Sequence, residues 1–469
     1  MRRASRRMSF MVPLMLFGWP LLTVLLFSAF KPRAAVLISF IGAWLFLPMA
    51  EYSIPGLPDY TKVSAATLGI LAGTLFFEPS RLFRFRPHWI DVPVIVYCLW
   101  SATSSFATGI GLWDAISAIV SEAIGWGLPY FIGRIYFTDL NAFRELAVGI
   151  VVGGLIYVPL CLIEIRLSPQ LHTWVYGFHQ HMFAQSIRFG GFRPTVFMQH
   201  GLAVAMWMIN ATLLAMWLRA TGAVRRLGGL PLELFVLVML ITCVLCKSTG
   251  ALALMLLGFA ALVVARLHNR SWPLYVLTAI APLWMIGRTF DWFNGQFVSD
   301  LFVGVSSERA ASFSIRLNQE NEILKTALQH PIFGGSRWFP DGADQLWLLC
   351  FRNFGAVGLA ALTSVFLLPG LVLCHRLTFT KLSHPDWAPV TGMILIVVLY
   401  MIDNLANSMM NPVFTMTAGA LGTAIAAQIG QRPECESATT DRRVRTPRLR
   451  RKLWPPPIPL GDRLNAKKC

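Results

Sequence analysis

Charged residues are scarce in this sequence, and acidic residues are the scarcest of them. Only 13% of the 469 residues are charged, whereas 55% are hydrophobic, and the mean hydropathy is +0.59. Soluble domains usually carry about 25% charged residues. This composition therefore excludes an ordinary soluble domain and indicates a chain whose main solvent is lipid.

The basic surplus does not indicate a nucleic-acid-binding protein. There are 40 Lys and Arg against 23 Asp and Glu, which gives a formal net charge of +17. No basic helix or recognition motif accompanies this charge, and much of it lies in short loops and in residues 431–469. Basic residues beside apolar segments are typical of cytoplasmic anchors on anionic lipid.

The eight cysteines are scattered singly through the sequence. They have neither the spacing of a metal site nor that of a disulfide framework, so we interpret them as small hydrophobic residues. We expect no metal and no cofactor.

Apolar segments long enough to cross about 30 Å of hydrocarbon recur along nearly the whole chain. Only helices satisfy their own backbone in that environment, so the sequence predicts an all-α, polytopic transmembrane helical bundle of about 12–13 spans. We expect a transmembrane domain over residues 1–430 and a basic, Pro-containing, disordered cytoplasmic tail over 431–469. The candidate spans are 9–30, 35–50, 65–77, 89–107, 115–133, 145–165, 196–218, 229–246, 251–265, 272–287, 346–374, 388–407 and 412–430.

The basic loops predict an orientation. Even numbers of spans separate these loops, so all of them can face the cytoplasm; they are 81–86, 134–144, 219–226, 266–270 and 375–381. The stretches 51–64, 166–195 and 288–345 then face outward, the last two as large periplasmic loops. The N-terminal arginines within 1–7 would also lie outside, although the positive-inside rule places basic residues in the cytoplasm. Either the segment 9–30, which we interpret as a retained span and not a cleaved signal, does not span, or two segments are divided wrongly.

The first large outer loop contains arginines that the positive-inside bias does not explain. Arg188 and Arg193 flank Gly190 and Gly191, and His200 follows where the chain enters the membrane. A guanidinium can hold two phosphate oxygens at once, so these arginines are candidate phosphate ligands. The alternative is that they reach toward lipid headgroups. His179 and His181 have no third ligand at a fixed spacing and do not indicate a metal site.

The second outer loop predicts an amphipathic helix on the membrane surface. Its apolar residues recur at spacings near 3.6, and Pro331 and Gly334 would end it. These apolar residues are Ile315, Ile323, Leu324, Ala327 and Leu328.

Two aspartates precede the next span. Asp344 opens that span, where water becomes scarce and a carboxylate can become a useful base. Asp344 as a helix N-cap is the alternative, because Asp also caps helices well. Asp341 lies three residues earlier.

The motifs in this region resemble those of the O-antigen ligase and polysaccharide polymerase superfamily. The resemblance covers about residues 60–430. It is carried by Arg316, by Ala327 followed by Pro331, Gly334 and Gly335, by Asp344 to Trp347, and by Gly355 and Gly358. The segment 188–201 is similar to an earlier R-x-x-G-x-F pattern, and the turn 247–250 is similar to an S-R-G-A turn.

The resemblance implies transfer of a glycan from an undecaprenyl-diphosphate carrier to an acceptor hydroxyl in the periplasm, by a bacterial inner-membrane protein. The fold would be related to the multi-spanning lipid-dependent glycosyltransferases. Expected partners are the undecaprenyl-diphosphate-linked saccharide, membrane lipid and other polysaccharide export or assembly proteins, and not nucleic acid. The expected catalytic residues are Asp344, Arg316 and Arg188, and the expected substrate-binding residues are Arg193, Arg337, Asp341, Glu320 and His200.

Two departures from the superfamily pattern favour a polymerase over a ligase. Ligases have histidine where this chain has Asp344, and the turn 247–250 lacks the arginine. Alternatives from other classes stay open: a transporter or flippase of lipid-linked sugars, which would use Glu122, Glu233 or Asp403 in or near spans, and a non-enzymatic export scaffold.

Overall fold

The computed structural model describes residues 9–54, 58–296, 307–335 and 344–427. The predicted tail 431–469, the N-terminal arginine cluster, Arg337 and Asp341 lie outside the described residues.

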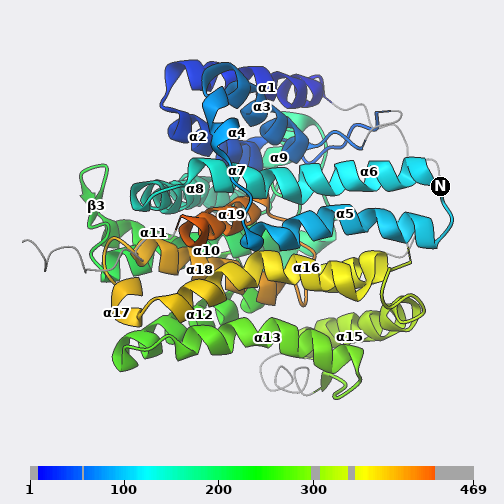
Figure 1. Cartoon of the computed structure of the whole chain (residues 1–469). Helices are drawn as coiled ribbons and strands as arrows, with labels where there is room; N and C mark the ends of the chain where they lie inside the picture. Colours follow the sequence, from blue (N-terminus) through cyan, green and yellow to red (C-terminus); the bar gives the residue numbers. More distant parts are fainter. Residues whose placement is uncertain (1–8, 55–57, 297–306, 336–343, 428–469) are drawn as a thin grey trace, which may run out of the picture. The chain divides into compact units, whose positions relative to one another are not determined.

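The described chain is almost entirely helical (Figure 1). Its α-helices are α1 (Met11–Ala29), α2 (Pro32–Phe46), α3 (Lys62–Phe77), α4 (Pro79–Arg84), α5 (Val92–Ala107), α6 (Leu112–Glu122), α7 (Leu128–Tyr136), α8 (Leu140–Leu167), α9 (Leu171–Tyr176), α10 (Gly201–Ala220), α11 (Leu232–Leu245), α12 (Thr249–His268), α13 (Trp272–Thr289), α15 (Ser307–Ala327), α16 (Leu346–Arg376), α17 (Phe379–Leu382), α18 (Ala388–Asp403) and α19 (Pro412–Ala426). Short 3-10 or π turns are η1 (Trp89–Asp91), η2 (Ala123–Gly127) and η3 (Phe183–Ser186). Two small antiparallel hairpins pair β1 (Ile187–Arg188) with β2 (Gly191–Phe192), and β3 (Arg226–Leu227) with β4 (Leu230–Pro231).

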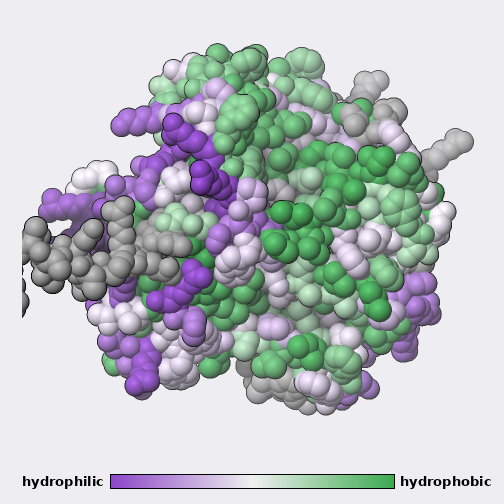
Figure 2. Space-filling model, in the orientation of Figure 1, coloured by the Kyte–Doolittle hydropathy of each residue, from purple (hydrophilic) through white to green (hydrophobic). Residues whose placement is uncertain are grey.

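A helix coincides with each of the thirteen predicted apolar segments. Seven helical stretches in the described residues are long and apolar enough to cross a membrane, and α2, α3, α11, α18 and α19 are shorter apolar helices. The prediction of an all-α, multi-pass membrane protein is therefore confirmed. Figure 2 agrees, because hydrophobic side chains cover most of the visible helical surface and hydrophilic ones gather toward its ends.

The centre of the bundle is formed by α10, α18 and α19, whose side chains are almost all buried. Close backbone contact holds α19 against α7. A Cβ atom on Gly133 would collide with the carbonyl oxygen of Met416, and one on Gly419 would collide with that of Tyr130. Small residues allow such approach between apolar helices, where packing and not hydrophobic burial drives association.

A buried ion pair fixes the C-terminal half of α7. The Arg134 guanidinium donates to both carboxylate oxygens of Asp91, at 2.6 and 3.0 Å, and to the Thr423 hydroxyl at 3.1 Å. The Tyr130 hydroxyl donates a further bond of 2.9 Å to Asp91. These bonds satisfy a charged pair that burial would otherwise make costly.

The five predicted basic loops lie together at one end of the bundle, here called the inner end. Contacts connect them in turn. Arg81 lies over the Tyr136 ring, Arg144 donates to the Ala223 carbonyl, Arg266 donates to the Ala220 carbonyl, and the Asn269 amide bonds to the Thr380 hydroxyl. In Figure 1, α17 and β3 mark this end, and α15 lies at the opposite, outer end.

The first helix joins the two ends, which bears on the unexplained N-terminal arginines. Ser9 lies against Gly177 in the first outer loop, whereas Arg33, just after α1, pairs with Asp139 at the inner end. The described helices support neither explanation offered from the sequence, because α1 packs alongside α2 and α3 and each of the thirteen predicted segments coincides with a helix. Lys31 and Arg33, which follow α1, supply basic residues to the inner end.

We predict that thiols introduced at the two ends react from opposite sides of the membrane. Gln319 on α15 and His384 beside α17 are both exposed. With Cys435 and Cys469 changed to serine, the remaining six cysteines are buried and should stay silent. In intact cells, an impermeant maleimide should label Gln319→Cys and spare His384→Cys until the membrane is opened, because basic loops face the cytoplasm. The reverse pattern would invert the topology.

Candidate functional site

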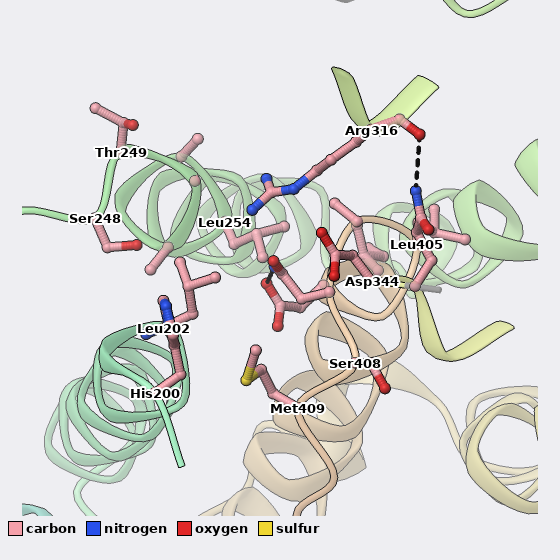
Figure 3. Close-up of a pocket in the computed structure, with 18 of the residues that line it drawn as sticks. His200, Leu202, Ser248, Thr249, Leu254, Arg316, Asp344, Leu405, Ser408 and Met409 are labelled. Atoms are coloured by element: carbon pink, nitrogen blue, oxygen red, sulfur yellow. Dashed lines mark hydrogen bonds between the residues drawn. The ribbon is translucent and has the colours of Figure 1, made fainter. Parts of the chain in front are cut away.

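A cavity of about 560 Å³ lies at the outer end of the bundle. It is formed by the N-terminal ends of α10, α12 and α16, by α15 and by the turn that follows α18 (Figure 3). Its volume is typical of small-ligand sites. Six of the eight predicted site residues line it, namely Arg188, Arg193, His200, Arg316, Glu320 and Asp344. The other two, Arg337 and Asp341, lie outside the described residues, and the roles of all eight stay predictions.

The hairpin β1–β2 brings Arg188 and Arg193 to the cavity. Phe189 and Gly190 turn the chain with positive φ angles of 49° and 64°, so Gly190 serves the tight turn between the two strands. Arg193 is 2% exposed and donates to the Lys247 carbonyl at 3.1 Å, while the Lys247 ammonium donates to the Phe189 carbonyl at 3.1 Å. The turn 247–250 is thus bonded to the hairpin from both sides.

A buried glutamate inside α8, which is not among the predicted site residues, holds the chain that follows the hairpin. The Glu164 carboxylate is fully buried and accepts from the backbone N–H groups of Leu171, Thr195 and Val196, at 3.0, 2.7 and 2.8 Å. Val196 has a positive φ of 47°, which these bonds stabilise. An acidic residue within an apolar segment was the only signal available for this contact.

His200 is a neutral cap at the start of α10. Its Nδ1 accepts from the Leu202 N–H at 3.0 Å, so Nε2 carries the proton and donates to the Gln185 side chain at 3.0 Å. Burial, followed by the nearby His181 and arginines, lowers the pKa of His200 to about 3. An imidazole in this state binds by a single donor and is not a useful base at neutral pH.

Arg316 extends from α15 into the cavity (Figure 3). Its backbone carbonyl accepts from the Gln345 side chain at 3.2 Å, which connects α15 to the start of α16. Within the described ranges, no carboxylate lies within ion-pair distance of the Arg316 guanidinium. This guanidinium is therefore available for an anionic ligand.

A buried ion pair holds the helix that carries Arg316. Arg288 at the end of α13 donates to Glu320 at 2.6 Å, and both side chains are 2% exposed. Arg288 also donates to the Phe293 carbonyl at 2.8 Å. Burial raises the pKa of Glu320, and the Arg288 charge opposes that shift. Glu320 lines the cavity, but its carboxylate is bonded to Arg288.

The predicted amphipathic helix is confirmed as α15, but its buried face differs from the predicted one. Ile323, Leu324 and Ala327 are buried as expected, whereas Ile315 and Leu328 are 60% and 46% exposed. The buried face instead includes Leu317 and Glu320. An apolar pattern could not place Glu320 inside, because its burial depends on Arg288 from another helix.

The glycines of the family-like motif join the end of α15 to a break in α16. Gly355 has a φ of 66° inside α16 and breaks the helix there. Backbone N–H and C=O groups beside this break bond to the segment 331–335 instead of to the helix. The Ala356 N–H donates to the Pro331 carbonyl, and the Gly335 N–H donates to the Arg352 carbonyl, both at 2.7 Å. A Cβ on Gly355 would collide with Ile332, so only glycine fits. We call this contact the 331–335 clasp.

Asp344 lies directly before α16, and its exposed side chain points into the cavity (Figure 3). The N-cap position of α16 is occupied by Gln345, whose side chain makes no capping bond. The interpretation of Asp344 as the N-cap is therefore wrong. The Leu346 N–H donates to the Asn407 carbonyl at 3.1 Å, which fixes the start of α16 beside the turn after α18.

Asp403 is a second carboxylate of this cavity that is not ion-paired, although from the sequence it was a candidate only for a transporter. It ends α18, is 8% exposed and accepts from the Asn407 amide at 2.8 Å. Its Oδ2 is buried without a hydrogen-bond partner in the described part of the chain. The sequence could not pair Asp403 with Asp344, because α18 returns to the cavity 59 residues later.

The described residues hold no group of three or more His, Cys, Asp and Glu side chains that could bind a metal ion. The metal-independent chemistry expected from the sequence stays a prediction. No protein-family model matches the chain, and no curated protein matches it either. The assignment of a function therefore depends on the site and on the resemblance of the motifs.

We predict that Glu320→Gln destabilises the protein far more than Glu322→Gln. Glu320 is buried against Arg288, so the change leaves a buried cation poorly paired and should cost about 3–5 kcal/mol. Glu322 is 72% exposed and pairs with Lys325, so its change should cost under about 1 kcal/mol. Thermal unfolding of the purified proteins in detergent measures both. Equal melting temperatures would show that the Arg288–Glu320 pair does not anchor α15.

Proposed function

We propose that this chain is an inverting, metal-independent glycosyltransferase of a bacterial inner membrane. It transfers a glycan from an undecaprenyl-diphosphate carrier to an acceptor sugar hydroxyl in the periplasm, as an O-antigen or exopolysaccharide polymerase. The observation that carries the proposal is the meeting of three arginines and two carboxylates that are not ion-paired in one outer-end cavity. These residues are Arg188, Arg193, Arg316, Asp344 and Asp403.

Arginine is suited to a diphosphate leaving group. Its planar guanidinium keeps its charge and binds two phosphate oxygens at once. Arg188 and Arg316 reach the cavity from the first and second outer loops, so a diphosphate between them would be held from two sides. Donors fixed before the reaction stabilise the charge that develops on the leaving group, and this effect is often the largest catalytic contribution.

The wall formed by α12 supports a lipid-linked donor. Leu254 and Leu257 line the cavity, and Leu257 is also 39% exposed on the side of the bundle. A polyprenyl chain could pass from the surrounding lipid to the arginines along such a wall. A soluble nucleotide sugar has no long apolar chain that could bind along this wall.

In the proposed reaction, a carboxylate accepts the proton of the acceptor hydroxyl. The oxygen attacks the anomeric carbon, the bond from that carbon to the diphosphate oxygen breaks, and the configuration inverts. Asp344 is the proposed base, because it is exposed to the cavity and capping does not explain it. A positioned base typically contributes about 10²–10⁴ in rate.

The flippase alternative has less support. Its three carboxylates are in separate places: Glu233 pairs with Arg219 at the inner end, Glu122 is buried at the end of α6, and Asp403 lines the outer cavity. The outer cavity and the second large cavity of the described chain share no residue. Ligase activity toward a lipid or protein acceptor differs only in the acceptor, and Asp344 in place of a histidine favours the polymerase.

We predict that Arg316→Lys is nearly as damaging as Arg316→Ala. An ammonium is a point charge and cannot reproduce two parallel bonds to a diphosphate. Polymer length on a gel, at matched protein abundance, is the measurement, and Arg270→Lys at the inner end is the control. Full-length polymer from Arg316→Lys would mean that Arg316 is only a surface charge.

We predict that Asp344→Asn slows glycan transfer by about 10²–10⁴ without loss of folded protein. Asparagine keeps the size of aspartate and its accepting oxygen but cannot take up a proton. Conversion of a lipid-linked oligosaccharide by the purified protein is the measurement. Asp386→Asn, an exposed aspartate at the inner end, is the matched control.

Near-normal conversion by Asp344→Asn would reject Asp344 as the base. Asp403→Asn should be measured in parallel, because Asp403 is the other described carboxylate of the cavity that is not ion-paired. A large loss in Asp403→Asn alone would transfer the role to that residue.

A further inference from the structure

A second cavity, of about 460 Å³, lies between α10, α11 and α12 toward the inner end. Its walls are almost wholly apolar and include Leu213, Trp217, Leu237, Phe259 and Val263. Three of these residues are partly exposed on the outside of the bundle: Leu237 at 55%, Phe259 at 43% and Val263 at 38%. The cavity is therefore a groove open to the lipid, and we call it the inner groove.

Charged side chains occur only at one end of the inner groove. Arg219 ends α10, Glu233 begins α11 and Arg266 lies in the last turn of α12. Arg219 and Glu233 form an ion pair, so their charges offset each other. Arg266 donates to the Ala220 carbonyl at 2.9 Å, and no described carboxylate lies within ion-pair distance of it. The rim thus carries one unbalanced positive charge.

We propose that the inner groove is a specific site for an anionic phospholipid of the leaflet at the inner end. One acyl chain lies along the apolar walls, and the phosphate lies on Arg266. The rim of the groove has a net positive charge and the surrounding inner-end loops are also basic, so both match an anionic headgroup. The volume is within the range of small-ligand sites. This site is independent of the proposed glycan transfer.

A lipid fits the groove better than a protein segment does. A peptide would bring backbone N–H and C=O groups against walls that offer almost no hydrogen-bonding partners, which is costly in an apolar setting. An acyl chain has no such groups. A helix of a second copy would satisfy its own backbone, so dimer formation is the outcome that must be distinguished.

The experiment uses the purified full-length protein in detergent, with phosphatidylglycerol and phosphatidylcholine of equal chain length as probes. Native mass spectrometry counts the lipids retained and also reports monomer or dimer. The wild type should retain phosphatidylglycerol in preference to phosphatidylcholine. Arg266→Gln should reduce that preference about fivefold, because one arginine at an anionic headgroup contributes about 1 kcal/mol. Arg270→Gln, in the same inner loop but outside the lining of the groove, should leave it unchanged.

A second variant tests the groove itself. Val263→Trp should fill the groove and remove the retained lipid of either class, whereas Leu256→Trp, on an exposed part of α12 outside the groove, should not. The proposal is overturned if Arg266→Gln and Arg270→Gln behave alike, or if Val263→Trp instead splits a dimer. Arg266 is exposed, so its variant decides the question even if Val263→Trp fails to fold.

Discussion

The whole structure depends on the high cost of an unpaired charge among apolar helices. Two almost fully buried arginines of the described chain are each bonded to a buried carboxylate, Arg134 to Asp91 and Arg288 to Glu320. Removing one partner of such a pair leaves a buried charge that neither water nor lipid can stabilise. These pairs lock α7 and α15 in place. The Arg316 guanidinium, in contrast, faces a cavity and has no such partner among the described residues, which is why we propose it as a ligand for the diphosphate.

The helical segments could be predicted from the sequence, because length and apolarity alone determine them. All thirteen segments coincide with helices, and the even spacing of the basic loops anticipated their contacts at one end. The failures were local. The exposure of Ile315 and Leu328 could not be foreseen, since the rotation of α15 is set by a charged pair and not by its apolar pattern. The break at Gly355 depends on a partner segment 20 residues away.

The site was predictable only in part. Arginines on the outer side had no topological explanation, and this anomaly led to Arg188 and Arg193, while the family resemblance added Arg316. All three line one cavity. Asp344 emerged from its position before a span. Glu164 could not be assigned to this region, because its partners include Thr195, 31 residues along the chain. Asp403 could not be placed beside Asp344, because 59 residues separate the two carboxylates in the sequence. Sequence spacing does not report contacts that close only when α8 and α18 pack into the bundle.

The 331–335 clasp has a consequence for how this protein can vary during evolution. At one edge of residues 336–343, Gly335 is bonded to Arg352, and at the other edge Gln345 and Leu346 are bonded to Arg316 and Asn407. Both edges are therefore fixed independently of whatever lies between them. Extra residues in a closed loop cost little, since closure entropy grows slowly with length. Insertions between these two edges would leave Arg316 and the start of α16 held as they are. Under the proposed function, related proteins could vary the acceptor through this segment while the proposed phosphate ligand and base keep their supports.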